Sequence, residues 1–593
     1  MGNLTLLFIS ILCSVCFFPM LGQVRVVDIN DLGTDLSFRI SPDVEGKVAI
    51  CESYFNYITA KTTREEITIF PGYPVNSSGA NERGGIYVNI DDDPAFELIY
   101  PVGAALHAFK IDGTNATGWP RTLDYPTDGA AAFGDIDGDG AGEIVVTTHQ
   151  VATFAFGTVY AFEIDGSNVS GFPVTTEGGG IRTPVLADLN GDDALEIIIT
   201  VRNWPDGLVY VYRGDGTIYN GWPVRMDYVP ASAVAVGDID GDEIPEIIAE
   251  SYYGLHAFTP DGLLIEGFPY YPAMNRVFSY SSPVLADITG NGKREIIFGD
   301  HSLEDGSGAI HIIDHEGNSL EGWPQITGSW IYGPPSVGDI DGDGLLDIAV
   351  GDQALSAVPV NKIYAWTGIT AETLQGFPIL EVFGVNSQII LADFDGDEMI
   401  ELVFDDNTEE GKYPGYNHDG TIMEGWPLQL NGSTFFVNPL VVDINQDGIM
   451  DMSGGGAVDG SGSTNIYLWN LNVEMDNRLA ILPILQYNTR HNGVYGDTLM
   501  VGIKEVETMI YDDWHLYPNP VTDYLTLTTK NRPLGDGISI SLYNASGTLL
   551  LNHISNKGES DIKLSLESYP PGVYLLYLFN ANKLKKVFKF IRL

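Results

Sequence analysis

An acidic nonapeptide recurs along the chain, and its side chains are of the kind that bind hard cations. The eight copies begin at residues 89, 135, 188, 238, 287, 339, 393 and 443. Positions 1, 3, 5 and 9 of a copy carry oxygen-bearing side chains, as in DIDGDGAGE at 135–143. Ca²⁺ takes about six to eight oxygen ligands, and a loop that alternates ligand and spacer residues and turns at glycine can surround it. The pattern therefore predicts a calcium ion in each loop, with position 7 adding a backbone carbonyl.

The eight loops do not fit this chemistry equally well. Asp and Gly also form Asx turns without any ion, but crowded carboxylates repel one another unless a cation lies among them. Mg²⁺ fits less well than Ca²⁺, because it requires a tighter octahedron. The copy at Asn89 has Pro94 at position 6, which cannot take a positive φ, and the copy at Asp287 offers only two carboxylates. The candidate metal ligands of the second to eighth copies are Asp135, Asp137, Asp139, Glu143, Asp188, Asn190, Asp192, Glu196, Asp238, Asp240, Asp242, Glu246, Asp287, Asn291, Glu295, Asp339, Asp341, Asp343, Asp347, Asp393, Asp395, Asp397, Glu401, Asp443, Asn445, Asp447 and Asp451.

Short strands surround each acidic loop. One unit runs from an apolar strand at 184–188 through the loop to a β-branched strand at 196–200, and then through a variable loop to an aromatic strand at 208–214. An Asp-Gly-Thr turn follows, and then a Gly-aromatic-Pro landmark that itself occurs eight times, from Gly72 to Gly425. Four short strands in about 50 residues are the size of one β-propeller blade. The units predict an all-β fold with an eight-bladed propeller, or a seven-bladed one if the degenerate first unit is not a blade.

The repeats are similar to those of a known family. DIDGDGAGEIVV and DIDGDGLLDIAVG resemble the FG-GAP (VCBS-like) repeats of integrin-type propellers. The resemblance covers about residues 70–496. It implies a calcium-binding propeller that acts as a binding or adhesion module.

The C-terminal residues differ from the repeats in charge and pattern. Residues 503–593 carry 9 acidic and 10 basic side chains, whereas the whole chain carries 80 and 29. LYPNPVTDYLTL, SLYNASGTLL and YPPGVYLLYL alternate apolar and polar residues between turns, which predicts a small β-sandwich. The same sequences resemble the C-terminal sorting domain of proteins exported by the type IX secretion system of Bacteroidetes. That resemblance implies a secreted or outer-membrane surface protein whose C-terminal domain contacts the secretion machinery.

The N-terminal residues predict export as well. The run LTLLFISILCSVCFFPMLG at 4–22 is apolar and uncharged, which is typical of a signal peptide, with an uncleaved anchor as the alternative. The predicted divisions of the chain are a signal peptide at 1–22, an N-terminal lead segment at 23–66, the propeller at 67–500, a linker at 501–515 and the C-terminal sorting domain at 516–593.

Composition excludes several classes of protein. Hydrophobic residues make up 44 % of the 593, enough for a large core. The formal net charge of −51 would repel nucleic acids and anionic membrane surfaces. Cys13 and Cys16 lie in the apolar run and leave Cys51 alone, so no disulfide framework can form. We expect a monomer that does not bind nucleic acid.

The order of turns in a blade predicts where a ligand binds. In a four-stranded antiparallel sheet the first and third turns lie at one edge, so the variable loops lie on the face opposite the acidic loops. These variable segments are rich in Tyr, Trp and Arg, either because propeller loops commonly are or because such residues carry binding energy. We expect an extracellular glycan or protein ligand, and the basic side chains favour an anionic or carbohydrate one. The candidate ligand-binding residues are Arg182, Arg202, Trp204, Arg225, Tyr228, Tyr253, Arg276 and Trp330.

Catalytic motifs are missing from the sequence, which favours a binding protein over an enzyme. It contains no HExxH, no GxSxG and no cysteine placed with a histidine as a nucleophile pair. We therefore assign no catalytic residue. The alternative is a polysaccharide lyase-like propeller acting on uronate-containing glycans, in which Arg or Ca²⁺ neutralises the uronate and Tyr, His or Lys removes a proton. Such a site would collect Arg, His and Tyr from neighbouring blades at the mouth of the central channel.

Overall fold

The computed structural model describes the repeat region and the strands of a second, C-terminal domain. The described residues are 66–81, 83–91, 93–127, 129–150, 155–180, 182–272, 275–278, 280–354, 356, 358–406, 411–458, 461–497, 514–517, 524–529, 538–544, 549–554, 561–566, 569, 572–580 and 583–592. The predicted signal peptide, the lead segment up to residue 65 and the linker up to residue 513 lie outside them.

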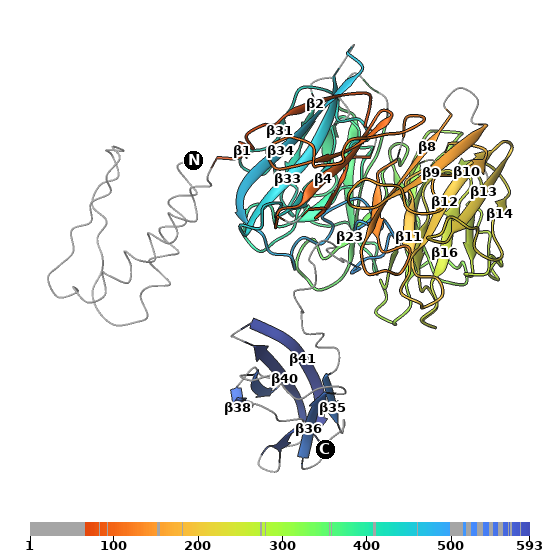
Figure 1. The fold of residues 1–593 in the computed structure, drawn as a ribbon. Coiled ribbons are helices and arrows are strands. Elements are labelled where there is room, and N and C mark those ends of the chain that lie inside the picture. The colour runs from red at the N-terminus through yellow and green to blue at the C-terminus, as the bar shows by residue number, and fades with distance from the viewer. Residues whose placement is uncertain are drawn as a thin grey trace, which may run out of the picture. The chain divides into compact units, whose positions relative to one another are not determined.

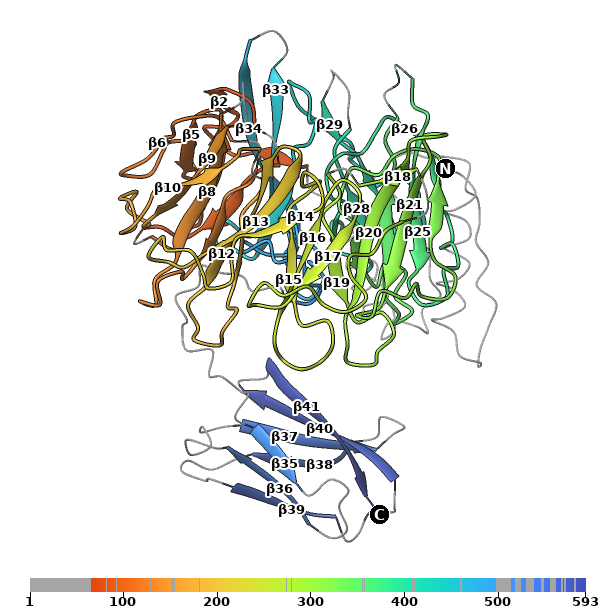
Figure 2. The same cartoon turned by 90° about the vertical axis from the view of Figure 1, so that its right-hand side faces the viewer.

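Nine antiparallel sheets, two of them in blade seven, form an eight-bladed β-propeller (Figures 1 and 2). The eight-bladed prediction is confirmed, and the degenerate first unit is a complete blade. The first four blades consist of β3 (Ile86–Val88), β4 (Glu97–Val102), β5 (Ala105–Phe109) and β6 (Arg121–Thr122); β7 (Ala132–Gly134), β8 (Glu143–His149), β9 (Phe156–Phe162) and β10 (Val174–Glu177); β11 (Val185–Ala187), β12 (Glu196–Asn203), β13 (Asp206–Tyr212) and β14 (Val224–Met226); and β15 (Ala235–Gly237), β16 (Glu246–Glu250) and β17 (Leu255–Phe258).

The other four blades follow the same strand order with small variations. Tyr270 replaces the fourth strand of blade four by a single bridge to Leu255, and the third strand of blade seven is split in two. These blades consist of β18 (Arg276–Val277), β19 (Val284–Ala286), β20 (Glu295–Ser302), β21 (Gly308–Ile313) and β22 (Gln325–Thr327); β23 (Ser336–Gly338), β24 (Asp347–Gly351), β25 (Asn361–Thr367) and β26 (Ile379–Val382); β27 (Ile390–Ala392), β28 (Glu401–Val403), β29 (Lys412–Tyr413), β30 (Gly415–Tyr416) and β31 (Leu428–Gln429); and β32 (Leu440–Val442), β33 (Ile449–Val458) and β34 (Ser463–Glu474).

The second strand of a blade contains a run of apolar residues where neighbouring blades cover both of its faces. In β12, Ile197, Ile198 and Ile199 are all buried, although successive side chains of a strand point to opposite faces. A strand with one solvated face would alternate apolar and polar residues instead. The β-branched composition therefore specifies a sheet that is packed between two others.

The N-terminal strands close the ring, which the sequence analysis did not predict. β1 (Thr68–Ile69) and β2 (Val75–Ser78) pair with β34, so they complete blade eight beside the last repeat. Figure 1 shows these red strands against the cyan β34. The first landmark, Gly72, precedes β2 in the way that the other landmarks precede fourth strands, and this order was a signal for the closure.

The Gly-aromatic-Pro landmarks join adjacent blades. The indole Nε1 of Trp119 donates to the carbonyl of Ile164 in the next blade at 3.1 Å, and Trp222 donates to Pro260 at 2.8 Å. Gly118 has a φ of 92°, and a Cβ there would collide with the carbonyl oxygen of Asp165. These landmarks therefore have a structural role.

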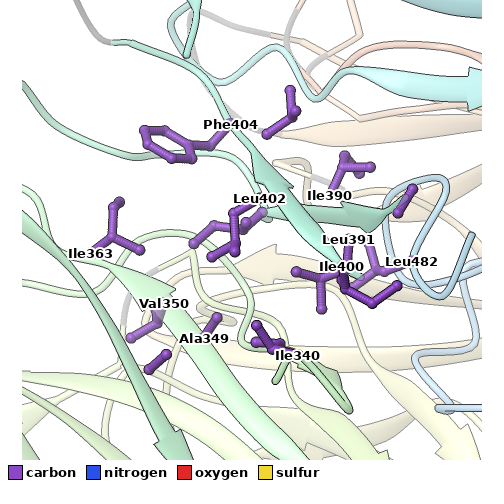
Figure 3. Close-up of a cluster of buried hydrophobic side chains, with 14 of the residues drawn as sticks. Ile340, Ala349, Val350, Ile363, Ile390, Leu391, Ile400, Leu402, Phe404 and Leu482 are labelled. Carbon is purple, nitrogen blue, oxygen red and sulfur yellow. The ribbon is translucent and has the colours of Figure 1, made fainter. Parts of the chain in front are cut away.

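The chain after the last blade fills the centre of the ring. We call residues 480–497 the central segment. Backbone N–H groups of the inner strands donate to its carbonyl oxygens, at 2.8–2.9 Å from Phe133, Leu186, Val236, Leu285 and Val441. Its apolar side chains join the blade cores, as Figure 3 shows for Leu482 beside Leu391 of blade seven.

The C-terminal domain is a β-sandwich, as predicted. Leu525 and Leu564 of one sheet pack in a single core with Ile540, Leu542 and Leu576 of the other. The domain consists of one sheet of β35 (Trp514–Tyr517), β36 (Tyr524–Thr529) and β39 (Asp561–Ser565), and another of β38 (Leu549–Ile554), β37 (Ile538–Asn544), β40 (Gly572–Asn580) and β41 (Lys583–Arg592).

Both domains confirm the all-β prediction, since no helix occurs in the part of the chain that the structure describes. Accordingly, no helix among these residues is long and apolar enough to cross a membrane.

Candidate metal centres and ligand face

Each acidic loop is curled by hydrogen bonds from its own backbone. In the second loop the carboxylate of Asp135 accepts the N–H groups of Gly138 and Gly140, at 2.7 and 2.9 Å. Glu143 at position 9 accepts the N–H of Ile136 at 2.8 Å, and the position 9 carboxylates of the other seven loops make the same bond. Positions 4 and 6 have positive φ angles in the second to eighth loops, including the non-glycine residues Asp193 at 71° and Gln446 at 59°. The fold thus turns several carboxylates toward one point.

Five of the loops bring at least three carboxylates together. In each group one oxygen from every residue lies within 4.8 Å of the others. These groups are Asp91, Asp93 and Glu97; Asp135, Asp137 and Glu143; Asp238, Asp240 and Glu246; Asp339, Asp341 and Asp347; and Asp393, Asp395, Asp397 and Glu401. Each group could hold a metal ion.

Buried carboxylate oxygens without a partner show that these loops fit a cation. Glu143 Oε1, Asp347 Oδ1 and Asp451 Oδ1 are buried and accept no hydrogen bond from the described residues. Burial and the neighbouring carboxylates raise the pKa of Glu143 and of Asp451 to about 8, and burial together with Asp395 raises that of Glu401 to about 9. An isolated buried charge is costly unless it is paired or coordinates a metal. A cation among these oxygens would remove that cost.

In two loops the equivalent oxygen of the position 9 carboxylate accepts a hydrogen bond from within the loop. In the third loop Asn190 Nδ2 donates to Glu196 Oε1 at 3.2 Å, and in the fifth loop the hydroxyl of Thr289 donates to Glu295 Oε1 at 3.1 Å. A side-chain donor at position 3 thus takes the place that a cation would have. We therefore rank these two loops below the second, fourth, sixth and seventh as metal sites.

The first loop is not among the metal ligands predicted from the sequence. Asp91, Asp93 and Glu97 nevertheless converge. The ammonium group of Lys110 forms ion pairs with Asp91 and, at 3.1 Å, with Asp93. The carboxylates at positions 3, 5 and 9 indicate this group in the sequence, whereas Pro94 at position 6 argues against a loop of the metal-binding type.

The variable loop of blade three lies at the opposite end of its strand from the acidic loop. The acidic loop leads into β12 at Glu196, and Trp204 follows the last residue of β12, Asn203. Eight residues of strand span roughly 26 Å at about 3.3 Å each. The structure thus places Trp204 far from Asp192.

Four of the eight predicted ligand-binding residues meet beside this loop. We call Arg202, Trp204, Tyr228, Tyr252 and Tyr253 the Trp204 cluster. The ring centroids of Trp204 and Tyr228 are 5.4 Å apart, those of Tyr228 and Tyr253 are 4.8 Å apart, and Arg202 lies 6.0 Å from the ring of Trp204. Trp204 is 66 % exposed and Tyr253 is 44 % exposed. Blades three and four therefore present aromatic faces to solvent.

A carboxylate lies next to this cluster. Asp227 accepts a hydrogen bond from Tyr271 at 3.1 Å and one from Ser251 at 2.5 Å. The ring of Tyr271 is 55 % exposed and extends the aromatic surface. The surface therefore combines aromatic faces with both a cationic and an anionic group.

The other four candidates lie elsewhere or have protein partners. Arg182 lies over the ring of Tyr280 at 4.8 Å, while Trp330 stacks on His301 at 4.0 Å and contacts Tyr332. Arg225 pairs with Asp206 in an ion pair whose arginine side chain is 64 % exposed. Arg276 is bound to the fully buried Asp300 through three hydrogen bonds of 2.6–2.9 Å.

We expect Arg276→Ala to destabilise the propeller strongly. Burial raises the pKa of Asp300, but His311 and Arg276 outweigh this and hold it below its usual value. Without Arg276 the carboxylate loses a main partner in a buried site, which costs about 3–5 kcal/mol. Arg225→Ala is the matched control, because an exposed ion pair contributes only about 0–1 kcal/mol. Urea unfolding of both variants measures the difference, and equal stability would show that the Asp300 pair is not structural.

Comparisons with known proteins agree with this architecture. The model of the FG-GAP-like repeat matches residues 188–249 and 278–350, and the model of the secretion system C-terminal sorting domain matches 515–592. A comparison with curated proteins gives no match.

Several solved structures are similar at low identity. The V. cholerae biofilm matrix protein Bap1 is 12 % identical over 72 % of this chain and 96 % of its own, with a TM-score of 0.37. Saccharomyces cerevisiae Sqt1 is 12 % identical over 69 % and 100 %, with a TM-score of 0.43. The BP39L lectin from Burkholderia pseudomallei is 9 % identical over 61 % and 100 %, with a TM-score of 0.36. At these TM-scores the likenesses carry no argument about this chain.

The family models and the fold point to the same conclusion. The matched repeats contain the acidic loops of blades three, four, five and six, and the matched sorting domain covers the C-terminal sandwich. A sorting domain of this type implies contact with the secretion machinery. The chain therefore carries FG-GAP-like repeats in an eight-bladed β-propeller and a type IX secretion C-terminal sorting domain, and it is a secreted or outer-membrane surface protein.

Proposed function

We propose that the propeller is a calcium-stabilised binding or adhesion module whose ligand is an extracellular carbohydrate. The observation that carries the proposal is the exposed Trp204 cluster on the face opposite the acidic loops. Large aromatic side chains are enriched where binding energy is concentrated, and four of them in mutual contact are unusual on a solvated surface.

The chemistry of the surface favours a sugar over an apolar partner. The apolar face of a sugar ring can stack on Trp204 or Tyr253, while its hydroxyl groups can donate to Asp227. Arg202 supplies a cationic group beside the indole, which suits an acidic sugar. The surface can therefore recognise a hydroxylated ring with or without a carboxylate.

Calcium has a structural role in this proposal. The acidic loops lie about one strand length from the Trp204 cluster, so a metal ion there cannot contact a ligand on the other face. The ions would hold the strand ends that carry the variable loops. Chelation would then reduce ligand binding only through loss of the fold.

Substitution of the Trp204 cluster tests the proposal. Once a glycan and matrix-protein screen has supplied a ligand, we expect Arg202→Ala with Trp204→Ala to abolish its binding. The melting temperature should change by about a degree, because exposed substitutions typically cost less than about 0.5 kcal/mol.

The control is Leu263→Ala, which removes a 67 % exposed apolar side chain from a turn on the acidic face. We expect this variant to bind as the unchanged protein does. Full binding by the double variant would place the ligand elsewhere on the propeller and refute the assignment of this surface.

A further inference from the structure

We infer that the ammonium group of Lys110 takes the place of the metal ion in the first acidic loop, so that blade one is held together without calcium. The inference rests on the calcium binding proposed above for the other loops. It assigns a role to a lysine that lies outside the nonapeptide and that follows the third strand of its blade.

The contacts of Lys110 are those of a bound cation. Its Nζ forms ion pairs with Asp91 and, at 3.1 Å, with Asp93, and both carboxylates belong to the convergent group that includes Glu97. An ammonium group can donate three hydrogen bonds and neutralises one charge. The side chains that would hold an ion in this loop therefore already share a cation that belongs to the chain.

The backbone of the first loop also differs from that of the metal-type loops. Position 1 is Asn89, whose amide donates to the carbonyl of Asp93 at 3.1 Å, whereas in other loops an aspartate at this position accepts N–H groups. Position 6 is Pro94, whose ring holds φ near −65° and whose nitrogen has no hydrogen to donate. The first loop thus lacks the inner carboxylate and the turn that the others use.

Other blades carry different residues at the position of Lys110. These positions are equivalent because each backbone N–H closes the following turn, as Lys110 does to Thr114 at 2.8 Å and Thr259 does to Leu263 at 2.9 Å. Blade three has Arg213 there, but its guanidinium donates to Ile218 at 3.0 Å. The equivalent residues of blades two, four, five, six and seven are Glu163, Thr259, Asp314, Thr367 and Asn417.

The replacement of an ion by Lys110 affects the closure of the ring, because of where blade one lies. Blade one lies next to the closure of the ring, and its loop is joined to the eighth loop by the bond from the Phe96 N–H to Ile444, at 2.8 Å, and by the bond from Gln446 to Pro94. A tethered cation offsets one of the three carboxylate charges of this loop at any calcium concentration, since its effective concentration does not depend on the solution. At the contact between the first and eighth loops, the first loop then does not need calcium.

Counting bound ions in the full chain tests the inference. We compare two double variants by equilibrium dialysis against ⁴⁵Ca²⁺. The first carries Asp91→Asn and Asp93→Asn, and the second carries Asp137→Asn and Asp139→Asn. We expect the first variant to bind as many ions as the unchanged protein and the second to bind one fewer. Loss of an ion from the first variant would overturn the inference. If the unchanged protein bound no calcium at all, the proposed function itself would fail, which is a distinguishable result.

A transplanted lysine gives a second test that does not disturb blade one. Thr259→Lys places an ammonium group beside the fourth loop, which contains Asp238, Asp240 and Glu246. We expect this variant to bind one ion fewer, whereas Leu263→Lys, which adds the same charge in the same turn, should bind the full number. An unchanged count for Thr259→Lys with an intact circular dichroism spectrum would show that a lysine at this position cannot replace the ion.

Discussion

Removal of calcium should lower the melting temperature of the propeller by roughly 10 °C. An ion that binds only the native state stabilises it by about 2.7 kcal/mol when its free concentration is about 100 times Kd. Four loops bring carboxylates together without an internal cation, and their stabilisation would sum to roughly 11 kcal/mol. A propeller of this size, residues 66–497, unfolds with an entropy of about 0.9 kcal/mol per degree, which gives the expected shift.

Thermal unfolding in calcium and in EDTA measures this effect. Readdition of Ca²⁺ should restore the transition, and the same concentration of Mg²⁺ should restore it only in part, because Mg²⁺ requires a tighter octahedron. Asp341→Asn should reduce the calcium-dependent shift, since Asp341 belongs to the convergent group of the sixth loop. Asp261→Asn, in a turn on the same face, is the control. Identical melting curves with and without EDTA would mean that the loops are Asx turns that need no ion.

The number and order of blades could be predicted because each repeat carries its own local information. The apolar strand, the acidic loop and the landmark before the fourth strand recur in every unit, and the structure places each where that order requires. The closure by β1 and β2 and the course of the central segment could not be predicted in the same way. Both depend on contacts between residues far apart in the sequence, such as Thr68 with Asn470, and neither repeats.

The candidate sites show the same division between local and distant information. Spacing within nine residues was enough to predict the acidic loops, because their ligands come from one short segment. It could not reveal that Lys110 pairs with Asp91 or that Asp300 binds Arg276, because the partners lie about 20 residues apart in different segments of the chain. Residue type alone thus gave Arg225 and Arg276 the same predicted role, whereas the structure pairs Arg225 with Asp206 at the surface and Arg276 with the buried Asp300.

A chain that ends at Met475 should fail to fold, whereas a chain that ends at Asp497 should fold as a complete propeller. The shorter chain lacks the central segment, so the apolar core residues of the blades that pack against Leu482, Ile484 and Tyr487 would be exposed. Burying an apolar side chain contributes about 1.5–3 kcal/mol, and each inner-strand N–H left unsatisfied costs about 1–3 kcal/mol. Several such losses exceed the total of about 5–15 kcal/mol by which proteins are stable.

The longer chain keeps every bond of the central segment and lacks only the residues after Asp497, which include the sorting domain. We propose that the propeller and the C-terminal domain are separate folding units, since the core of the sandwich consists of its own residues. Circular dichroism and calcium binding should therefore be retained in the longer chain, but its export to the cell surface should be lost. Unfolding of the longer chain would show that the two domains share a core. A folded shorter chain would show that the blades alone stabilise the ring, and the central segment would then have no structural role.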